Sequence, residues 1–245
     1  MKTIFTITKK ELRSFFSSAT GYIVLAIFLI GGALFLWVFP NQYNVLDSGY
    51  ASLDGLFALA PMLFLFLCPA ITMRLFAEEK QQGTLEMLLS RPISKLSLVL
   101  GKALSGWLLV IIALLGTLVW YFSIKILAVP VGNVDSGAFW GSFIGLLLLS
   151  GVYVSVGVFA SSIADNQVVA FIISAVLCFT LFLGFNFVSA LFTNGATSRF
   201  ISSIGIDYHY KSISRGVIDS RDLLYFIVVS AIFLFFSKII LERKK

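Results

Sequence analysis

The stretch RLFAEEKQQGTLEMLLSRPISK, residues 74–95, is a charged segment between two long apolar runs. It holds four basic and three acidic residues, whereas the runs at 56–73 and 103–124 hold no charged residue. An apolar run of about 20 residues is long enough to cross a bilayer as a helix. The charged segment therefore marks a place where the chain leaves the lipid, and it predicts a membrane protein that crosses the bilayer more than once.

The composition of the whole chain excludes a water-soluble globular domain. Only 12% of the 245 residues are charged and 59% are hydrophobic, whereas about 25% of the residues in soluble domains are charged. So few charges cannot cover a water-facing surface, so the surroundings must be a lipid membrane. The net charge of +6 does not predict a nucleic-acid partner, because the basic residues gather at the ends of apolar runs, where they face lipid headgroups.

Six apolar runs are predicted to span the membrane, and together they predict an all-α membrane protein with a single transmembrane domain over residues 1–245. Pro61 and Pro69 interrupt the second run. Neither cysteine suggests a disulfide, since Cys68 and Cys178 both lie inside apolar runs. The six runs cover about 21–39, 56–73, 103–124, 138–161, 168–192 and 223–241.

The distribution of basic residues predicts the orientation of these spans. With the N-terminus inside, 13 of the 18 Lys and Arg residues fall in inner segments and five in outer ones. Because inner loops carry the excess of Lys and Arg, we expect both termini to be cytoplasmic. The longest outer loop, 193–222, has too many apolar residues for a free loop. We therefore expect short helices there that rest on the outer leaflet or dip into it.

Residues 2–19, before the first span, have the pattern of an amphipathic helix. At helical spacing one arc carries apolar side chains and the opposite side carries Lys2, Lys9, Lys10 and Arg13. Ile7 does not fit this pattern. We predict a helix lying in the cytoplasmic interface, and a frayed basic leader is the alternative. The apolar arc consists of Ile4, Phe5, Leu12, Phe15, Phe16 and Ala19.

The sequence offers no catalytic, cofactor or metal site. The only histidine, His209, lies between two tyrosines in the outer loop, which indicates loop packing or anchoring at headgroups. Gly101-Lys102 is not a phosphate-binding loop, because it lacks the earlier glycine and the following Ser or Thr. The apolar cores hold no paired ionisable groups for an intramembrane enzyme. We therefore expect a non-catalytic protein.

The charged segment contains one short predicted helix. Gly83 should end the preceding helix, Thr84 can cap the next one, and Pro92 should stop it. Two interpretations stay open from these residues. The segment is either a rigid knob that sits in a cleft of a soluble partner, or a solvated reverse turn. Within the helix, one face would carry Leu85, Leu88 and Leu89, and another would carry Glu86.

The string AEEKQQGTLEMLLSRPIS, residues 77–94, resembles the inner-loop signature of ABC-2 type permeases, the membrane subunits of a class of ATP-driven exporters. With the N-terminal helix, six spans and long last outer loop, the resemblance covers essentially the whole chain. The string DYHYKSISRGVIDSRDLLYF, residues 207–226, is similar to the last outer loop of the gliding-motility (GldF-like) subfamily. NosY-like permeases share much of the pattern.

The resemblance implies a docking surface for a separate ATPase. In this family the segment at 78–92 includes a coupling helix that contacts the nucleotide-binding subunit, and the turn at 161–167 would be a smaller second contact. The helix at 2–19 would be an interfacial elbow beside it. The implied docking residues are Glu78, Glu79, Gly83, Thr84, Leu85, Glu86, Leu88, Leu89, Pro92 and Asp165.

The implied function is that of a permease subunit without cofactors of its own. ATP and magnesium would be bound by a GldA-like ATPase. A GldG-like membrane subunit with a large outer domain, or a second permease copy, would complete the complex. ATP hydrolysis would then drive export or conformational work across the membrane. The alternative is a membrane anchor or scaffold for an ATPase-driven envelope machine, without transport of a substrate.

Overall fold

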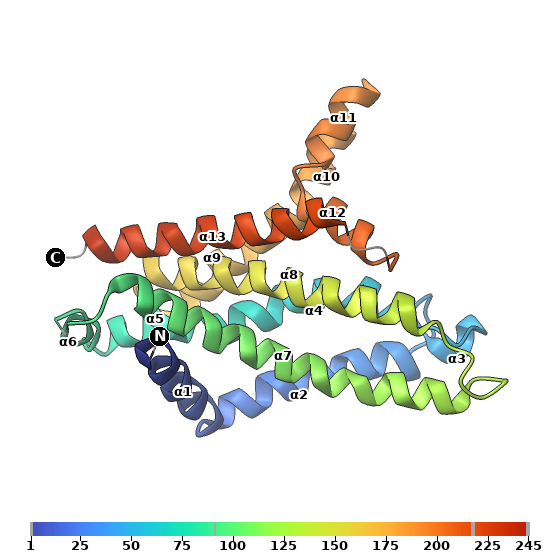
Figure 1. The fold of residues 1–245 in the computed structure, drawn as a ribbon, viewed down its shortest axis with the longest axis horizontal. Helices are drawn as coiled ribbons and strands as arrows, with labels where there is room; N and C mark the ends of the chain where they lie inside the picture. Colours follow the sequence, from blue (N-terminus) through green and yellow to red (C-terminus); the bar gives the residue numbers. More distant parts are fainter. Residues whose placement is uncertain (1, 91, 217–218, 244–245) are drawn as a thin grey trace.

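The computed structural model describes residues 2–90, 92–216 and 219–243, and its regular elements in these ranges are all helices. Six helical segments are long and apolar enough to cross a membrane, which confirms the predicted fold class. They lie side by side along the long axis of the molecule, except that the C-terminal part of the fifth segment, α10 (Phe185–Ala190), leans away from the others (Figure 1). These segments are Ala19–Val38, Asp54–Gln81, Lys95–Leu127, Ser136–Ile163, Gln167–Ala190 and Ser220–Arg243.

The chain order of the elements shows how short helices connect the spans. Two π-helical turns, η1 (Leu34–Val38) and η2 (Thr180–Gly184), continue the first and fifth spans. The α-helices are α1 (Lys2–Phe16), α2 (Ala19–Ala33), α3 (Val45–Ser48), α4 (Asp54–Thr72), α5 (Arg74–Gln81), α6 (Leu85–Leu89), α7 (Lys95–Leu127), α8 (Ser136–Ile163), α9 (Gln167–Phe179), α10 (Phe185–Ala190), α11 (Gly195–Ser202), α12 (Ile206–Ile213) and α13 (Ser220–Arg243).

Two spans extend further than their apolar runs. Helix α4 runs through both prolines, and Met73, itself in helical conformation, joins it to α5. Helix α7 begins at Lys95, eight residues before the predicted span, because Ser94 caps it by accepting a hydrogen bond from the Ser97 amide at 3.2 Å. Lys102, which the sequence places outside the third span, therefore lies inside a continuous helix.

Helix α8 lies at the centre of the bundle and contacts α4, α7, α9 and α13. Its glycines allow the close approach of neighbouring elements. A Cβ atom on Gly157 would overlap the side chain of Thr72, and one on Gly145 would lie 3.0 Å from the Ile213 side chain. These two glycines therefore permit close packing of α8 against its neighbours.

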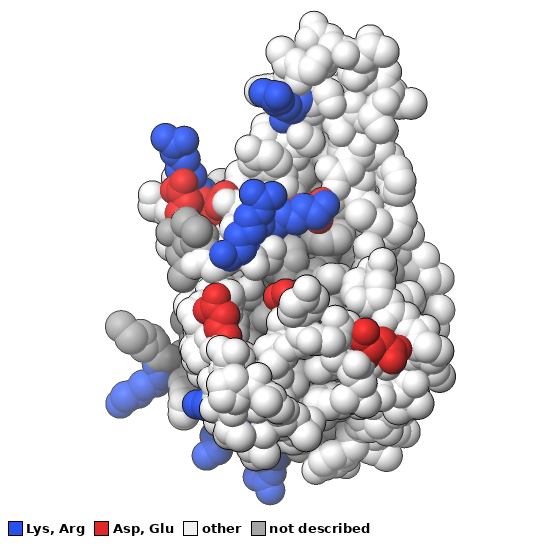
Figure 2. All heavy atoms as spheres, turned by 90° about the vertical axis from the view of Figure 1, so that its right-hand side faces the viewer, with Lys and Arg blue, Asp and Glu red and all other residues white. Residues whose placement is uncertain are grey.

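The last loop forms short helices, as predicted. Helix α11 and the preceding α10, which ends the fifth span, lean away from the bundle, whereas α12 packs back onto α8 and α13 (Figure 1). His209 makes packing contacts here: its ring stacks on Tyr225 at 3.9 Å and its Nδ1 lies 2.7 Å from Asp222 Oδ1. Viewed from this end, the molecule carries scattered acidic and basic groups on a mostly uncharged surface (Figure 2).

Candidate docking site at the basic end

One end of the bundle, the basic end, carries α1, α5, α6 and the C-terminal end of α13 (Figure 1). Helix α6 follows Gly83, whose φ of +69° is the left-handed conformation that favours glycine. The predicted helix break is therefore confirmed. The predicted cap is wrong, because the Thr84 side chain makes no capping bond and its Oγ1 instead donates to Glu79 O at 3.3 Å.

The leucines of α6 face the body of the protein. Leu85 is buried, and Leu88 and Leu89 are half-buried against the hydrophobic core. Glu86 is exposed, and Met87 is 72% exposed. The predicted leucine face thus holds the helix in place and leaves its other face open to solvent.

A hollow of about 950 Å³ at the basic end is lined by residues from three separate parts of the chain. Five of the residues implied by the family resemblance, from two different loops, meet there. Glu78, Glu79, Thr84, Leu88 and Pro92 are not among its lining residues. The lining consists of Lys80, Gly83, Leu85, Glu86 and Leu89, with Lys95 from the start of α7 and Asp165 from the turn between α8 and α9.

Lys80 holds the turn between α8 and α9 against α5. Its Nζ donates to Ser162 O at 2.6 Å and to Ala164 O at 2.8 Å, and it lies 3.9 Å from the Asp165 carboxylate. A lysine that satisfies the last carbonyls of a helix also interacts favourably with the helix dipole. The two loops predicted to contact a partner are therefore joined to each other.

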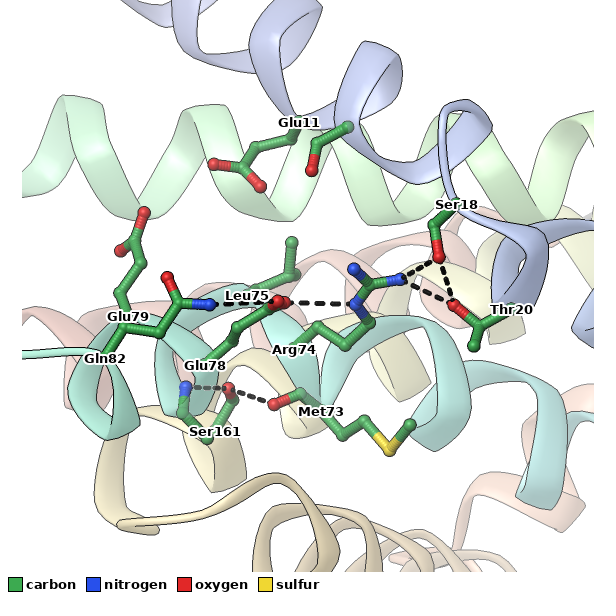
Figure 3. Close-up of polar contacts among 12 residues, drawn as sticks. Glu11, Ser18, Thr20, Met73, Arg74, Leu75, Glu78, Glu79, Gln82 and Ser161 are labelled. Atoms are coloured by element: carbon green, nitrogen blue, oxygen red, sulfur yellow. Dashed lines mark hydrogen bonds and ion pairs between the residues drawn. The ribbon is translucent and has the colours of Figure 1, made fainter. Parts of the chain in front are cut away.

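Ser161 joins the end of α8 to the junction of α4 and α5. Its hydroxyl oxygen accepts hydrogen bonds from the amides of Phe76 and Ala77, at 2.9 and 3.0 Å. The same hydroxyl donates to Met73 O at 3.0 Å, one of the contacts drawn in Figure 3. One buried side chain thus satisfies three backbone groups where the two helices meet.

Glu78 belongs to a row of polar contacts along α5 (Figure 3). Arg74 Nε donates to Glu78 Oε2 at 3.1 Å, and Gln82 Nε2 donates to the other oxygen at 3.4 Å. Arg74 Nη1 also donates to Thr20 Oγ1 at 2.9 Å, in the first turn of α2. The row connects the segment before α6 to the first span.

Lys102 is the centre of a buried ionic cluster. Only 1% of its side chain is exposed, and its Nζ lies 2.9 Å from Glu79 Oε1 and 3.1 Å from Glu11 Oε1. It also donates to Leu75 O and lies 5.0 Å above the ring of Phe76. This one ammonium group connects α1, α5 and α7. Glu79, assigned by the resemblance to the docking surface, instead points into the protein.

Lys10 completes the cluster from its solvent side. Its Nζ lies 3.3 Å from Glu79 Oε1 and 3.4 Å from Glu11 Oε1. Burial acts to lower the pKa of Lys10, but the charges and hydrogen bonds of the two carboxylates outweigh it, so the pKa is raised. Two cations therefore face two anions, a balance that limits the cost of burying Lys102.

The N-terminal helix packs on α7 through a face that the sequence pattern missed. Thr8 Oγ1 donates to Gly101 O at 3.0 Å, and a Cβ atom on Gly101 would lie 2.9 Å from Ile7 Cβ. Ile7, which did not fit the predicted arc, is buried, whereas Phe5 is 70% exposed. Phe15 is buried as expected for an apolar face. The position of Gly101 on α7 decides which face of α1 packs there, and the sequence of α1 alone does not reveal it.

Within the part of the chain that the structure describes, no three potential metal-ligating side chains come together. The basic end presents a short braced helix, α6, beside an open hollow. A family model described as an ABC-2 family transporter protein matches residues 5–244, nearly the whole chain. No curated protein matches the sequence.

Proposed function

The chain belongs to the ABC-2 family of transporter proteins, and we propose that a separate ATPase subunit docks on its basic end. Membership makes it a non-catalytic membrane permease of an ABC transporter, whose ATP hydrolysis takes place in a partner. The observation that carries the docking proposal is the shared hollow. Residues of α6 and of the turn between α8 and α9, about 80 positions apart, line it together.

The contacts behind α6 support a path for force into the spans. Helix α6 is connected to α5, and α5 is joined to α1 and α7 through Lys102, to α2 through Arg74, and to α8 through Ser161 and Lys80. A displacement of α6 would therefore move several spans together. A flexible loop in its place would absorb the same displacement.

We further propose an inner-membrane location with both termini cytoplasmic, and a gliding-motility type of complex. The orientation is supported by the 13 basic residues on the side of the termini against five on the other. The subfamily, with its GldA-like ATPase and GldG-like membrane subunit or second permease copy, is supported by the resemblance of residues 207–226. A neighbouring reading frame that encodes an ATPase with ABC motifs would support this assignment, and neighbours of other kinds only would count against it.

Charge reversal on α6 tests the docking proposal. Glu86 is exposed and lines the hollow, so Glu86→Lys should lower recovery of the co-expressed ATPase by about tenfold, the effect of about 1.4 kcal/mol in binding. Membrane insertion should not change. Asp47→Lys, a charge reversal at another exposed position, in α3, is the matched control and should recover the ATPase like the wild type. Equal recovery with both variants would show that α6 is not the docking element.

A further inference from the structure

We infer that a groove between α7, α8 and α13 binds an acyl chain of an anionic phospholipid, with the headgroup at the basic end. The groove has a volume of about 380 Å³. Every lining residue belongs to one of these three spans and none is charged. They are Leu100, Ala103, Leu104 and Trp107 of α7, Leu147, Leu148, Gly151, Val154 and Ser155 of α8, and Phe226, Ile227, Ser230, Ala231 and Leu234 of α13.

Two of the three polar side chains in the wall of the groove, those of Trp107 and Ser155, are hydrogen-bonded within the protein, and the third is Ser230. Trp107 Nε1 donates to Leu147 O at 3.0 Å and to Ser150 Oγ at 3.1 Å. Ser155 Oγ donates to Gly151 O at 2.8 Å, within its own helix. A polar ligand would lose its hydrogen bonds to water and gain few in return. A hydrocarbon occupant loses nothing there, so the chemistry of the wall selects an apolar chain.

The size of the groove selects a lipid chain over a protein helix. A helix is about 10 Å in diameter, so 380 Å³ would hold roughly one turn of it. A water molecule takes about 30 Å³ in the liquid, and a methylene group is of similar size, so the same volume holds about a dozen methylene groups. There is free space beside Gly151 in the wall, because a Cβ atom added there would come no closer than 3.6 Å to its nearest neighbour, Trp107 Nε1.

The basic end of the groove carries cationic groups. Ile227, Ala231 and Leu234 lie on one face of α13, and Lys238 follows four residues later on the same face, about 6 Å nearer that end. Lys95 Nζ donates to Leu241 O at 2.9 Å and so holds a second cation between α7 and α13.

One acidic group lies among these cations. Glu242 is 3.5 Å from Lys238 and contributes one negative charge, against three positive charges on Lys95, Lys238 and Arg243. Arg243, next to Glu242, is exposed. A phosphate group would therefore meet excess positive charge where the acyl chain leaves the groove.

Quenching of tryptophan fluorescence by brominated lipids tests the proposal. The chain has four tryptophans, so the full-length protein with Trp37, Trp120 and Trp140 changed to Phe reports on Trp107 alone. It is reconstituted in phosphatidylcholine vesicles that contain increasing amounts of brominated phosphatidylglycerol or brominated phosphatidylcholine. Half-maximal quenching should require about fivefold less of the anionic lipid, the preference expected from one basic side chain near the headgroup.

Two variants and one control separate a site from ordinary lipid contact. Lys238→Gln should reduce the preference for the anionic lipid, and Ala231→Phe should fill the groove and reduce quenching by both lipids. A chain that retains only Trp120, outside the groove, should respond equally to both lipids. Equal quenching of Trp107 by the two lipids would overturn the proposal. Absence of quenching by either lipid would also overturn it.

Discussion

Replacing Lys102 by methionine removes the charge of the buried cluster and keeps most of the side-chain volume. The wild-type ammonium group lies 2.9 and 3.1 Å from two carboxylates, and the lysine is 1% exposed. Glu79 and Glu11 have side chains only 15% and 14% exposed, so solvent cannot replace the lost partner. Lys102→Met should therefore destabilise the protein strongly.

The magnitude follows from the geometry of the cluster. At an effective dielectric constant of about 20, each ion pair at this distance contributes on the order of 5 kcal/mol of attraction, most of which desolvation offsets. Removing one partner of such a buried pair costs about 3–5 kcal/mol, because the other charge stays buried. Lys10, 3.3 Å from Glu79 Oε1, still compensates part of the charge. We therefore expect a loss of about 3 kcal/mol.

The assay is denaturant unfolding of the purified protein in detergent micelles, followed by circular dichroism. Lys125→Met, on the exposed opposite end of the same helix, is the matched control and should change the free energy of unfolding by less than about 0.5 kcal/mol. Glu79→Gln removes one of the two stranded carboxylates. In that background Lys102→Met should cost at least about 1 kcal/mol less than in the wild type.

Two results would refute this reasoning. If Lys102→Met and Lys125→Met lowered stability equally, the cluster would not contribute to the folded state. If the effects of Lys102→Met and Glu79→Gln were simply additive, the two residues would not be coupled, and the connection between α5 and α7 would have to come from other contacts.

Two further substitutions test contacts of α8 with the same unfolding assay. Ser161→Ala leaves buried backbone groups at the junction of α4 and α5 unpaired and should lower the free energy of unfolding by about 1–3 kcal/mol. Ser155→Ala is the control and should lower it less, because the Ser155 hydroxyl bonds within its own helix. The reverse order would contradict the role assigned to Ser161. Gly157→Ala forces a methyl group against Thr72 of α4 and should lower the free energy of unfolding by about 1–3 kcal/mol. Gly151→Ala is the control, because a Cβ atom has room at that position. If the two variants lost the same stability, the close approach of α8 and α4 at Gly157 would be excluded.

Features with local causes were predictable from the sequence. The six spans follow from the lengths of the apolar runs alone. A run of about 20 apolar residues crosses a bilayer as a helix, because a helix satisfies its backbone hydrogen bonds internally where no water is present. The limits of α6 follow from Gly83, whose positive φ ends one helix, and from Pro92, which prevents the next from continuing. The predicted cap at Thr84 failed, since a hydroxyl that can cap a helix can equally bond to a nearby carbonyl.

Features that depend on distant partners were decided only by the tertiary structure. The sequence places Lys102 just outside the third span, where a charge beside an apolar run normally marks the exit from lipid. The family resemblance places Glu79 on the docking surface. Their burial depends on Glu11, 91 positions from Lys102, and on the packing of α1 over Gly101. Burying a charge is costly unless an opposite charge lies beside it. Which charges lie beside one another is decided by the packing of distant segments, so the sequence of one segment does not reveal it.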